Sequence, residues 1–430
     1  MNAHGYALVL RSCLLLGLLL GVPLLAFAQG GGSANFGTSF NPVGSGARAM
    51  GQGNAFIAVA DDATAASWNP AGLAQLERPE CSLAGEYWHS YGRVLSPAEY
   101  RSEHETSLAD INYASIVYPF RLAGRNVVAS LNYLKMYDFD QQMSMPAYDD
   151  FTSTWTAQYR LAQAGSLSVV APAVAVDLTD SLAVGLTFNI WNNNITQNSS
   201  FQKTQVLQMS EAGVRRDELF TVKEGYSVVL GTLYRLDKQW TIGGVVKAPF
   251  SIQLQHRTTA GFSEGDPVWN NLPSVESDAT LNMPLVLGGG LAWRPIDPLT
   301  ICMDVTWTQW SQFTLKEDQA RNPITSNPIE EGRCRDAYTV RIGTEYILPF
   351  ESYQIPLRCG LGYDPEPGVK RIVDYYTANL GVGIQWGRYA LDAAYELRWG
   401  NKVHTGTLTT LQGAEDSLQH RVLLSLIVYL

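Results

Sequence analysis

Apolar and polar residues alternate most clearly between Leu299 and Trp310. The odd-numbered positions from Leu299 to Trp307 are all apolar, whereas the even-numbered positions between them carry Thr, Cys and Asp. Residues 240–250 and 389–399 repeat this pattern. Because successive side chains of a strand point to opposite faces, each stretch predicts a strand with one apolar and one polar face.

Stretches of this kind follow one another along most of the chain, so the sequence predicts an all-β fold. Three of them, near 110–120, 164–177 and 223–236, are apolar on both faces, which leaves their register open. The full set of predicted strands lies near residues 80–91, 110–120, 126–138, 164–177, 181–192, 223–236, 239–253, 279–294, 299–312, 336–347, 354–364, 375–386, 389–400 and 419–430.

The connections between these strands alternate between short and long. Links after even-numbered strands are tight, such as Thr179-Asp180 and Asp237-Lys238, whereas links after odd-numbered strands are long, such as 139–163 and 193–222. Short turns on one side and long loops on the other are typical of outer-membrane barrels, while a soluble sandwich has turn signals about every 8–12 residues and no such asymmetry. We therefore predict a fourteen-stranded antiparallel transmembrane β-barrel.

The long connections at 139–163 and 193–222 contain apolar side chains among polar ones. One interpretation is an exposed surface that captures amphipathic ligands, and the other is packing of the loops on one another above the barrel. The side chains concerned are Phe139, Met143, Met145, Tyr148, Phe151, Trp155, Phe201, Val206, Leu207 and Met209.

The N-terminus predicts export. Arg11 is followed by an apolar run from Leu14 to Leu25, and Ala26-Phe27-Ala28 fits a secretory cleavage site, so we assign residues 1–28 to a signal peptide. No apolar run of about 18 residues follows it, which argues against a helical membrane protein. Cleavage of the signal peptide removes one basic residue, Arg11, and leaves 29 basic and 40 acidic residues, a net charge of −11. This charge argues against nucleic acid as a partner.

A stretch rich in Gly and Ala, from Gly44 to Leu73, precedes the first predicted strand. It carries Asp61 and Asp62 and ends in Asn69-Pro70-Ala71-Gly72, a compact turn that fits neither a strand nor a long helix. Because small residues allow close backbone packing, this segment could fill a confined space.

This stretch resembles the N-terminal plug of the FadL/TodX family of outer-membrane transporters for hydrophobic compounds. The sequences of PorV-like barrels of type IX secretion have a similar N-terminal stretch. Further stretches resemble FadL/TodX members specifically, namely residues 240–250, 304–313, 334–346 and 357–367. The resemblance implies a plug at residues 29–78 inside a barrel formed by residues 79–430, through which hydrophobic molecules pass from outside and leave sideways toward the bilayer.

The resulting hypothesis is passive uptake of long-chain fatty acids or other hydrophobic compounds across the outer membrane of a Gram-negative type envelope, without catalysis or cofactor. The plug residues Asn69, Pro70, Ala71, Asp61 and Asp62 would form the gate. The partners would be hydrophobic small molecules and outer-membrane lipid. The alternative is a PorV-like accessory barrel for protein secretion or surface attachment, which would have a protein partner. A non-specific porin does not fit an occluding plug.

Alternation also gives candidate ligand contacts in the lumen. Trp88, Trp191 and Val245 could form apolar walls, and Lys247, Arg341, Arg358 and Arg398 could bind a carboxylate. These cations could instead neutralise the inward acids and hold the plug in place, since buried charges are kept mainly in pairs. The acids concerned are Asp304, Glu345, Asp364, Asp392 and Glu396. Asp61 and Asp62 fit a turn cap or a pair with an inward Arg better than acid–base catalysis.

Neither the cysteines nor the histidines predict a metal site. Cys81, Cys302, Cys334 and Cys359 fit no zinc spacing, and alternation places Cys302 in the lumen and Cys359 toward lipid, so these two should not bond to each other. We therefore predict isolated thiols and no bound metal.

Overall fold

A computed structural model describes residues 44–95, 101–149, 154–197, 199–209, 212–264, 273–324, 327–368, 372–403 and 414–430. The predicted signal peptide lies outside these residues, as do positions 29–43. Every structural statement below concerns the described part of the chain.

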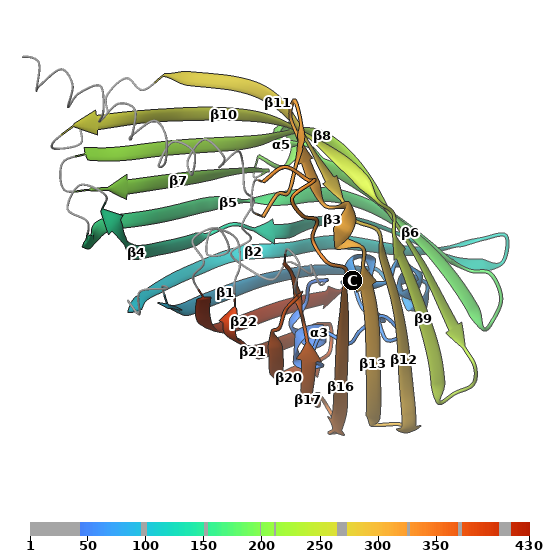
Figure 1. The fold of residues 1–430 in the computed structure, drawn as a ribbon. Coiled ribbons are helices and arrows are strands. Elements are labelled where there is room, and N and C mark those ends of the chain that lie inside the picture. The colour runs from blue at the N-terminus through green and yellow to red at the C-terminus, as the bar shows by residue number, and fades with distance from the viewer. Residues whose placement is uncertain are drawn as a thin grey trace, which may run out of the picture.

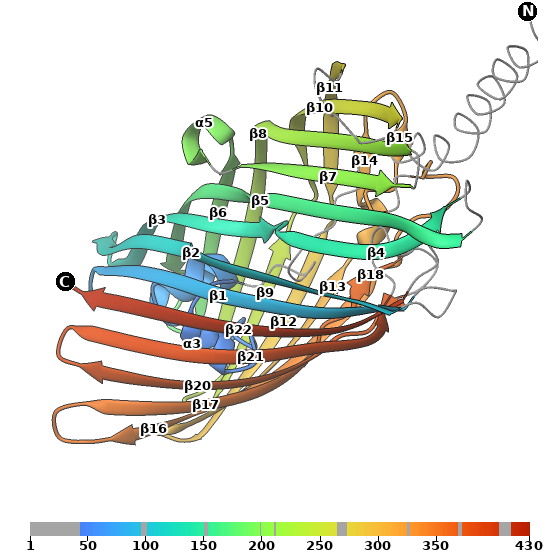
Figure 2. The ribbon, with the colours of Figure 1, turned by 90° about the vertical axis from the view of Figure 1, so that its left-hand side faces the viewer.

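Fourteen antiparallel strands form a closed ring, as predicted. The ring closes where β1 pairs with β22 over its whole length, from Glu80 opposite Tyr429 to Leu95 opposite Ala414. Figures 1 and 2 show the barrel from two directions. Its strands are β1 (Glu80–Leu95), β2 (Arg101–Leu122), β3 (Arg125–Asp138), β5 (Thr154–Asp177), β6 (Leu182–Trp191), β8 (Ala212–Arg235), β9 (Trp240–Lys247), β12 (Val286–Ile296), β13 (Leu299–Thr308), β16 (Ala337–Pro349), β17 (Gln354–Tyr363), β20 (Tyr376–Trp386), β21 (Tyr389–Val403) and β22 (Ala414–Tyr429).

The long connections are mostly strands, so their prediction as loops was wrong. β5 and β8 each run for 24 residues, and additional strands pair with their outer parts. This pairing satisfies backbone groups that an irregular loop would leave to water. The additional elements are β4 (Gln141–Asp149), α5 (Asn193–Thr196), β7 (Ser200–Gln208), β10 (Phe250–Glu264), β11 (Ser274–Met283), η2 (Trp310–Gln312), β14 (Thr314–Lys316), β15 (Ala320–Arg321), β18 (Glu366–Pro367) and β19 (Ile372–Val373).

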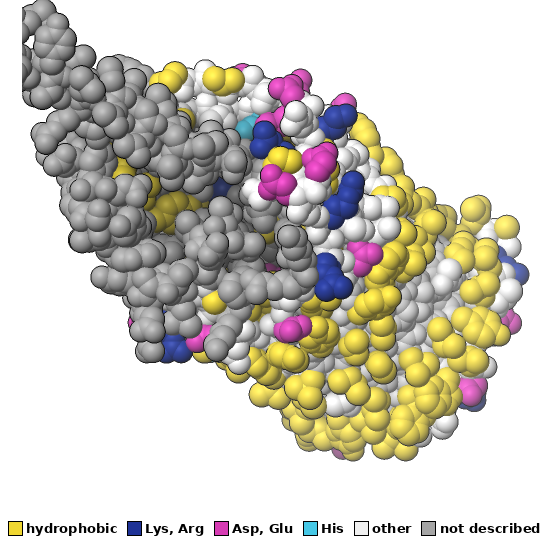
Figure 3. All heavy atoms as spheres, viewed as in Figure 1, with side chains coloured by type: hydrophobic (Ala, Val, Ile, Leu, Met, Phe, Trp, Pro, Cys, Tyr) yellow, Lys and Arg dark blue, Asp and Glu magenta, His cyan; other side chains and the backbone are white. Residues whose placement is uncertain are grey.

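The outer surface of the ring is apolar. In β13, Met303 and Val305 face outward and are 44% and 40% exposed, whereas Cys302 and Asp304 face inward and are 1% and 2% exposed. Figure 3 shows apolar side chains gathered over the part of the surface formed by β9, β12, β13 and β16. An apolar outer band around a polar interior is the arrangement of a membrane barrel. Separately, the described residues contain no helix long and apolar enough to cross a membrane.

Local irregularities explain the strands whose register was open. The pairing of β1 with β2 shifts at Asn112, which is an extra residue, and the pairing of β10 with β8 shifts at Lys223. Each bulge reverses which alternate positions point inward, so strict alternation along the sequence places apolar residues on both faces of the strand. In β5 the cause differs: Val174 faces outward, while Ala173 and Ala175 pack against the N-terminal segment.

The N-terminal segment, defined here as residues 44–76, lies inside the ring (Figure 2). It contains α3 (Ala47–Gly51), α4 (Ala65–Trp68) and η1 (Pro70–Gln75). Its alanines and Leu73 are buried against strands from both halves of the barrel. Cys81, Cys302, Cys334 and Cys359 are all free thiols, with Cys302 buried and Cys359 exposed as predicted.

Candidate functional site

Asn69 connects the N-terminal segment to the barrel wall. Its side-chain oxygen accepts a hydrogen bond from the Ala71 amide at 3.1 Å and so caps η1, which begins at Pro70. Its side-chain nitrogen donates to the Ile57 carbonyl at 2.8 Å and to the Thr232 carbonyl of β8 at 2.9 Å. One fully buried amide therefore fixes a turn, joins two parts of the segment and joins the segment to the barrel.

Asp61 and Asp62 have different partners. Asp62 accepts hydrogen bonds from the backbone amide and hydroxyl of Thr64, at 2.8 and 2.6 Å, which stabilises the turn before α4. Asp61 lies 2.5 Å from the guanidinium of Arg48, and Asp62 lies 3.6 Å from it. Arg48 was not identified from the sequence, although a lone basic residue in a Gly- and Ala-rich stretch beside two acids was an available signal.

Arg48 also connects the segment to the barrel through a network of alternating charges. Its guanidinium lies 2.9 Å from Glu345 of β16, Glu345 lies 2.6 Å from Arg358 of β17, and Arg358 lies 2.5 Å from Asp392 of β21. Glu345 and Arg358 are direct neighbours in the β16–β17 register. Arg358 is thus placed among carboxylates of the protein.

Arg398 and Arg341 hold the small β18–β19 hairpin against the inside of the wall. Arg398 lies 2.7 Å from Glu366 and 3.4 Å from Asp364, and Arg341 lies 3.0 Å from Asp364. The Arg398 guanidinium also lies 3.7 Å from the ring centre of Tyr375, a cation–π contact. Arg398 therefore already has protein partners in Glu366, Asp364 and Tyr375.

A pocket lies between the N-terminal segment and the wall where two strands bend. β9 and β10 are separated at Pro249, and β11 and β12 at Pro284, because proline has no N–H for the sheet ladder. The aromatic lining consists of Trp68, Tyr137, Trp191, Phe250 and Trp310, and the charged lining of Lys247, Asp304 and Arg341.

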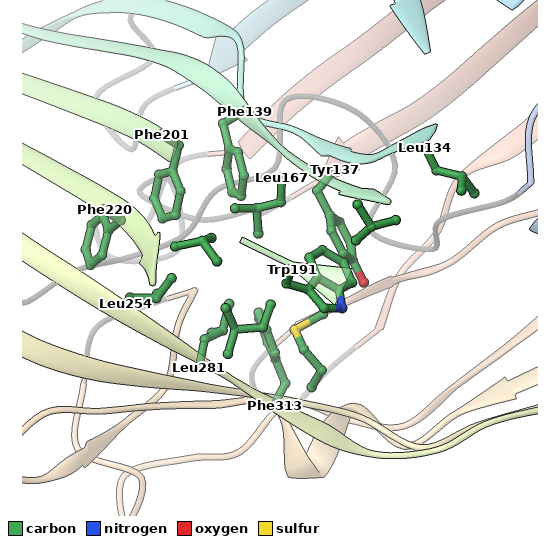
Figure 4. Packing of buried hydrophobic residues seen from close by; sticks show 14 of the residues in the cluster. Leu134, Tyr137, Phe139, Leu167, Trp191, Phe201, Phe220, Leu254, Leu281 and Phe313 are labelled. Atoms are coloured by element: carbon green, nitrogen blue, oxygen red, sulfur yellow. The ribbon is translucent and has the colours of Figure 1, made fainter. Parts of the chain in front are cut away.

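The pocket brings together four of the predicted ligand contacts and not the others. It is lined by Trp191, Val245, Lys247 and Arg341, whereas Trp88 is buried elsewhere on the inner face and Arg358 and Arg398 belong to the networks above. Trp191 is stacked between Tyr137 and Phe250 at centroid distances of 6.4 and 5.3 Å, and its indole N–H donates to Ser227 at 3.1 Å. The rings of Trp191 and Tyr137 lie side by side in Figure 4.

Beyond the pocket, toward the long hairpins, the inner face of the barrel carries a row of stacked rings. Phe139, Phe201, Phe220 and His256 follow one another at centroid distances of 4.1, 4.6 and 4.0 Å, and Figure 4 shows the three phenylalanines in a row. Phe139, Met143, Phe201 and Met209 are buried, which favours packing over an exposed capture surface. Side chains of Met145, Tyr148, Phe151 and Trp155 lie outside the described set.

His256 ends this row in a cluster of ionisable side chains that also contains Glu218 and Glu317 and that sequence reasoning did not find. The outward-facing residues of β10 around it, Gln253, Gln255 and Arg257, are polar, so this part of the barrel lies beyond the apolar band. Burial opposes the charged form of His256, but hydrogen bonds with Glu218 and Glu317 outweigh it and raise its pKa. Burial likewise opposes the Glu218 carboxylate, but His256 and nearby cations lower its pKa to about 2.

Comparison with known proteins identifies the family. The sequence matches the outer membrane protein transport family (OMPP1/FadL/TodX) over residues 38–422. The chain belongs to this family. As an OMPP1/FadL/TodX protein it is an outer-membrane transporter of hydrophobic compounds and not an enzyme.

Solved structures share the fold at low sequence identity. The Pseudomonas putida toluene transporter TodX superposes with a TM-score of 0.60 at 14% identity, covering 91% of this chain and 99% of that one. The Ralstonia pickettii toluene transporter TbuX gives 0.59 at 15% identity with the same coverage, and the monoaromatic hydrocarbon channel CymD gives 0.53 at 13%. A search of curated proteins found no match.

Proposed function

We propose that this transporter takes up long-chain fatty acids or similar amphipathic acids, with the N-terminal segment acting as the gating plug. The observation that carries the proposal is the pocket beside that segment. Five aromatic side chains line it together with Lys247 and Arg341. An apolar cavity with a few placed polar groups is the usual form of a small-molecule site, and here two of those groups are cations suited to a carboxylate.

The gating proposal rests on the position of the segment. Its residues Asn54, Ile57, Ser67 and Trp68 form one side of the pocket, while Asn69 and Arg48 connect it to the wall. A ligand in the pocket would therefore contact the segment directly. Asn69, Pro70 and Ala71 would hold the turn, and Asp61 and Asp62 would keep Arg48 in place.

A neutral monoaromatic hydrocarbon is the competing ligand class, because TodX and CymD are described as channels for such compounds. Lys247 and Arg341 favour the acid, since a neutral hydrocarbon makes no use of a cation in the pocket. Two acids offset part of this charge. Asp364 lies 3.0 Å from Arg341, and Asp304 also lines the pocket, although its Oδ2 already accepts hydrogen bonds from the Phe56 and Ile57 amides at 2.7 and 2.9 Å.

Uptake by cells that lack their own transporter of this family would test the proposal. Cells producing the protein should accumulate labelled oleate faster than cells with an empty vector, and oleate should co-purify with gently extracted protein. Accumulation of toluene without oleate would overturn the ligand assignment. A stoichiometric protein partner in place of bound lipid would instead support an accessory role in secretion.

A further inference from the structure

On the inner face of the described barrel wall, three pairs of glycines face each other across neighbouring strands. Gly185 of β6 is directly opposite Gly231 of β8, Gly243 of β9 is opposite Gly290 of β12, and Gly343 of β16 is opposite Gly360 of β17. The six positions therefore make three places where two adjacent strands both lack a side chain.

Each glycine pair is in contact with one part of the N-terminal segment. Gly185 and Gly231 contact Asn69, Pro70 and Ala71; Gly243 and Gly290 contact Ile57 and Ala58; Gly343 and Gly360 contact Gln52 and Gly53. A Cβ atom added at any of the six would lie closer than 3.0 Å to the segment, mostly to its backbone, a separation that real Cβ atoms essentially never show.

Specific hydrogen bonds accompany two of the three contacts. Next to Gly231, the carbonyl of Thr232 accepts from the Asn69 side chain, and opposite Gly290, Asp304 of β13 accepts from the Phe56 and Ile57 amides. The wall thus combines close backbone approach with directional bonds at the same places. Neighbouring Gly289 offers a contrast, because a Cβ there would meet no atom within 4 Å.

We infer that these three glycine pairs are seats that fix the depth and orientation of the N-terminal segment in the barrel. The inference adds to the proposed gating by saying how the segment is held, and it depends on the proposed function only for the route that the ligand takes. Because the seats hold the segment at three points on six strands, the segment stays in the barrel as one body during transport. A ligand passes along its pocket side, by rearrangement of the side chains of Trp68, Trp191 and their neighbours.

Alanine substitution of single seats tests this directly. Gly231→Ala, Gly243→Ala and Gly343→Ala should displace the segment and raise the ion conductance of purified protein in planar bilayers above the wild-type level. Gly289→Ala, on the same strand as Gly290, is the matched control and should conduct like wild type. Heat-modifiable electrophoretic mobility reports whether each barrel has folded, and wild-type conductance in folded seat variants would overturn the inference.

A cross-link tests the same inference without adding bulk at a seat, so it also covers the case in which the alanine variants do not fold. The Cys302 thiol of β13 lies 3.4 Å from the side-chain oxygen of Gln52 in the segment. In a Gln52→Cys variant whose Cys81, Cys334 and Cys359 are serines, a short thiol cross-linker should join residues 52 and 302. Oleate uptake should persist after cross-linking, whereas its loss on cross-linking would show that the segment must move as a body.

These outcomes are distinct from failure of the proposed function. If wild-type protein transports no oleate, the ligand assignment fails while the conductance comparison still decides the seats. In that case the cross-linked variant is assayed with toluene.

Discussion

The side-chain amide of Asn69 donates a hydrogen bond to the backbone carbonyl of Thr232 at 2.9 Å, across 163 positions of sequence. The same nitrogen donates to Ile57, so one residue satisfies two buried carbonyls of separate elements. Leaving a buried polar group unsatisfied costs about 1–3 kcal/mol.

Asn69→Ala should therefore lower the free energy of unfolding by about 2–4 kcal/mol, since it removes two such bonds and the cap of η1. Denaturant unfolding of the protein in detergent, followed by tryptophan fluorescence, measures the change. Asn194→Ala is the control, because Asn194 is exposed in α5. A loss equal to that of the control would contradict the role given to Asn69.

Arg358 should be needed for stability because it lies between two buried carboxylates, Glu345 and Asp392. Arg358→Met should cost about 3–5 kcal/mol, the usual penalty for removing one partner from a buried ionic network. The exposed pair of Arg257 and Glu276, with side chains 52% and 47% exposed, is the comparison. Arg257→Met should cost less than about 1 kcal/mol, and equal effects of the two variants would be evidence against the network.

Lys247 should contribute to binding of an acid but not of a hydrocarbon. A hydrogen bond to a charged group contributes about 1.5–3 kcal/mol, so Lys247→Met should weaken oleate binding by roughly 10- to 100-fold. Toluene binding should change little. Isothermal titration with both ligands separates these effects. Lys223→Met serves as the control, because Lys223 is exposed and paired with Asp278; a comparable oleate defect there would contradict the assignment.

The His256 cluster predicts a pH dependence of stability. Because the folded-state pKa of His256 is raised, its contribution is fully present below its unfolded value of about 6.5 and is lost as pH rises through the folded value. The free energy of unfolding should therefore fall above about pH 6.5 in wild type. His256→Gln should remove this dependence, and Glu317→Gln should reduce it. An unchanged profile in His256→Gln would exclude the cluster as its origin.

The strands could be predicted from the sequence because the two faces of each strand lie in different environments, which produces alternation of apolar and polar residues within the strand itself. The apolar side of β13 meets lipid and its polar side meets the N-terminal segment, so five successive pairs of residues carry the signal. The long hairpins were missed because beyond the apolar band both faces carry polar residues. In β7, for example, the two buried positions are Phe201 and Lys203, so the inward face itself mixes apolar and polar residues.

The site was harder to predict because it depends on register between distant strands. Arg358 and Lys247 look alike in sequence, yet Arg358 is opposite Glu345 in its ladder while Lys247 is opposite Val229 and Val286. The same holds for the glycines: Gly289 and Gly290 are neighbours, but only the second faces inward. Which charge lies opposite a carboxylate in the ladder, and which glycine contacts the N-terminal segment, therefore follow from strand pairing that no local pattern records.

The bond from the Ala47 amide to the Ser425 hydroxyl, 3.2 Å long, joins residues 378 positions apart. Residue 47 belongs to the start of the chain and residue 425 to its final strand. The N-terminal segment therefore gains this contact only once β22 is in place, which couples the position of the segment to the strand that closes the barrel.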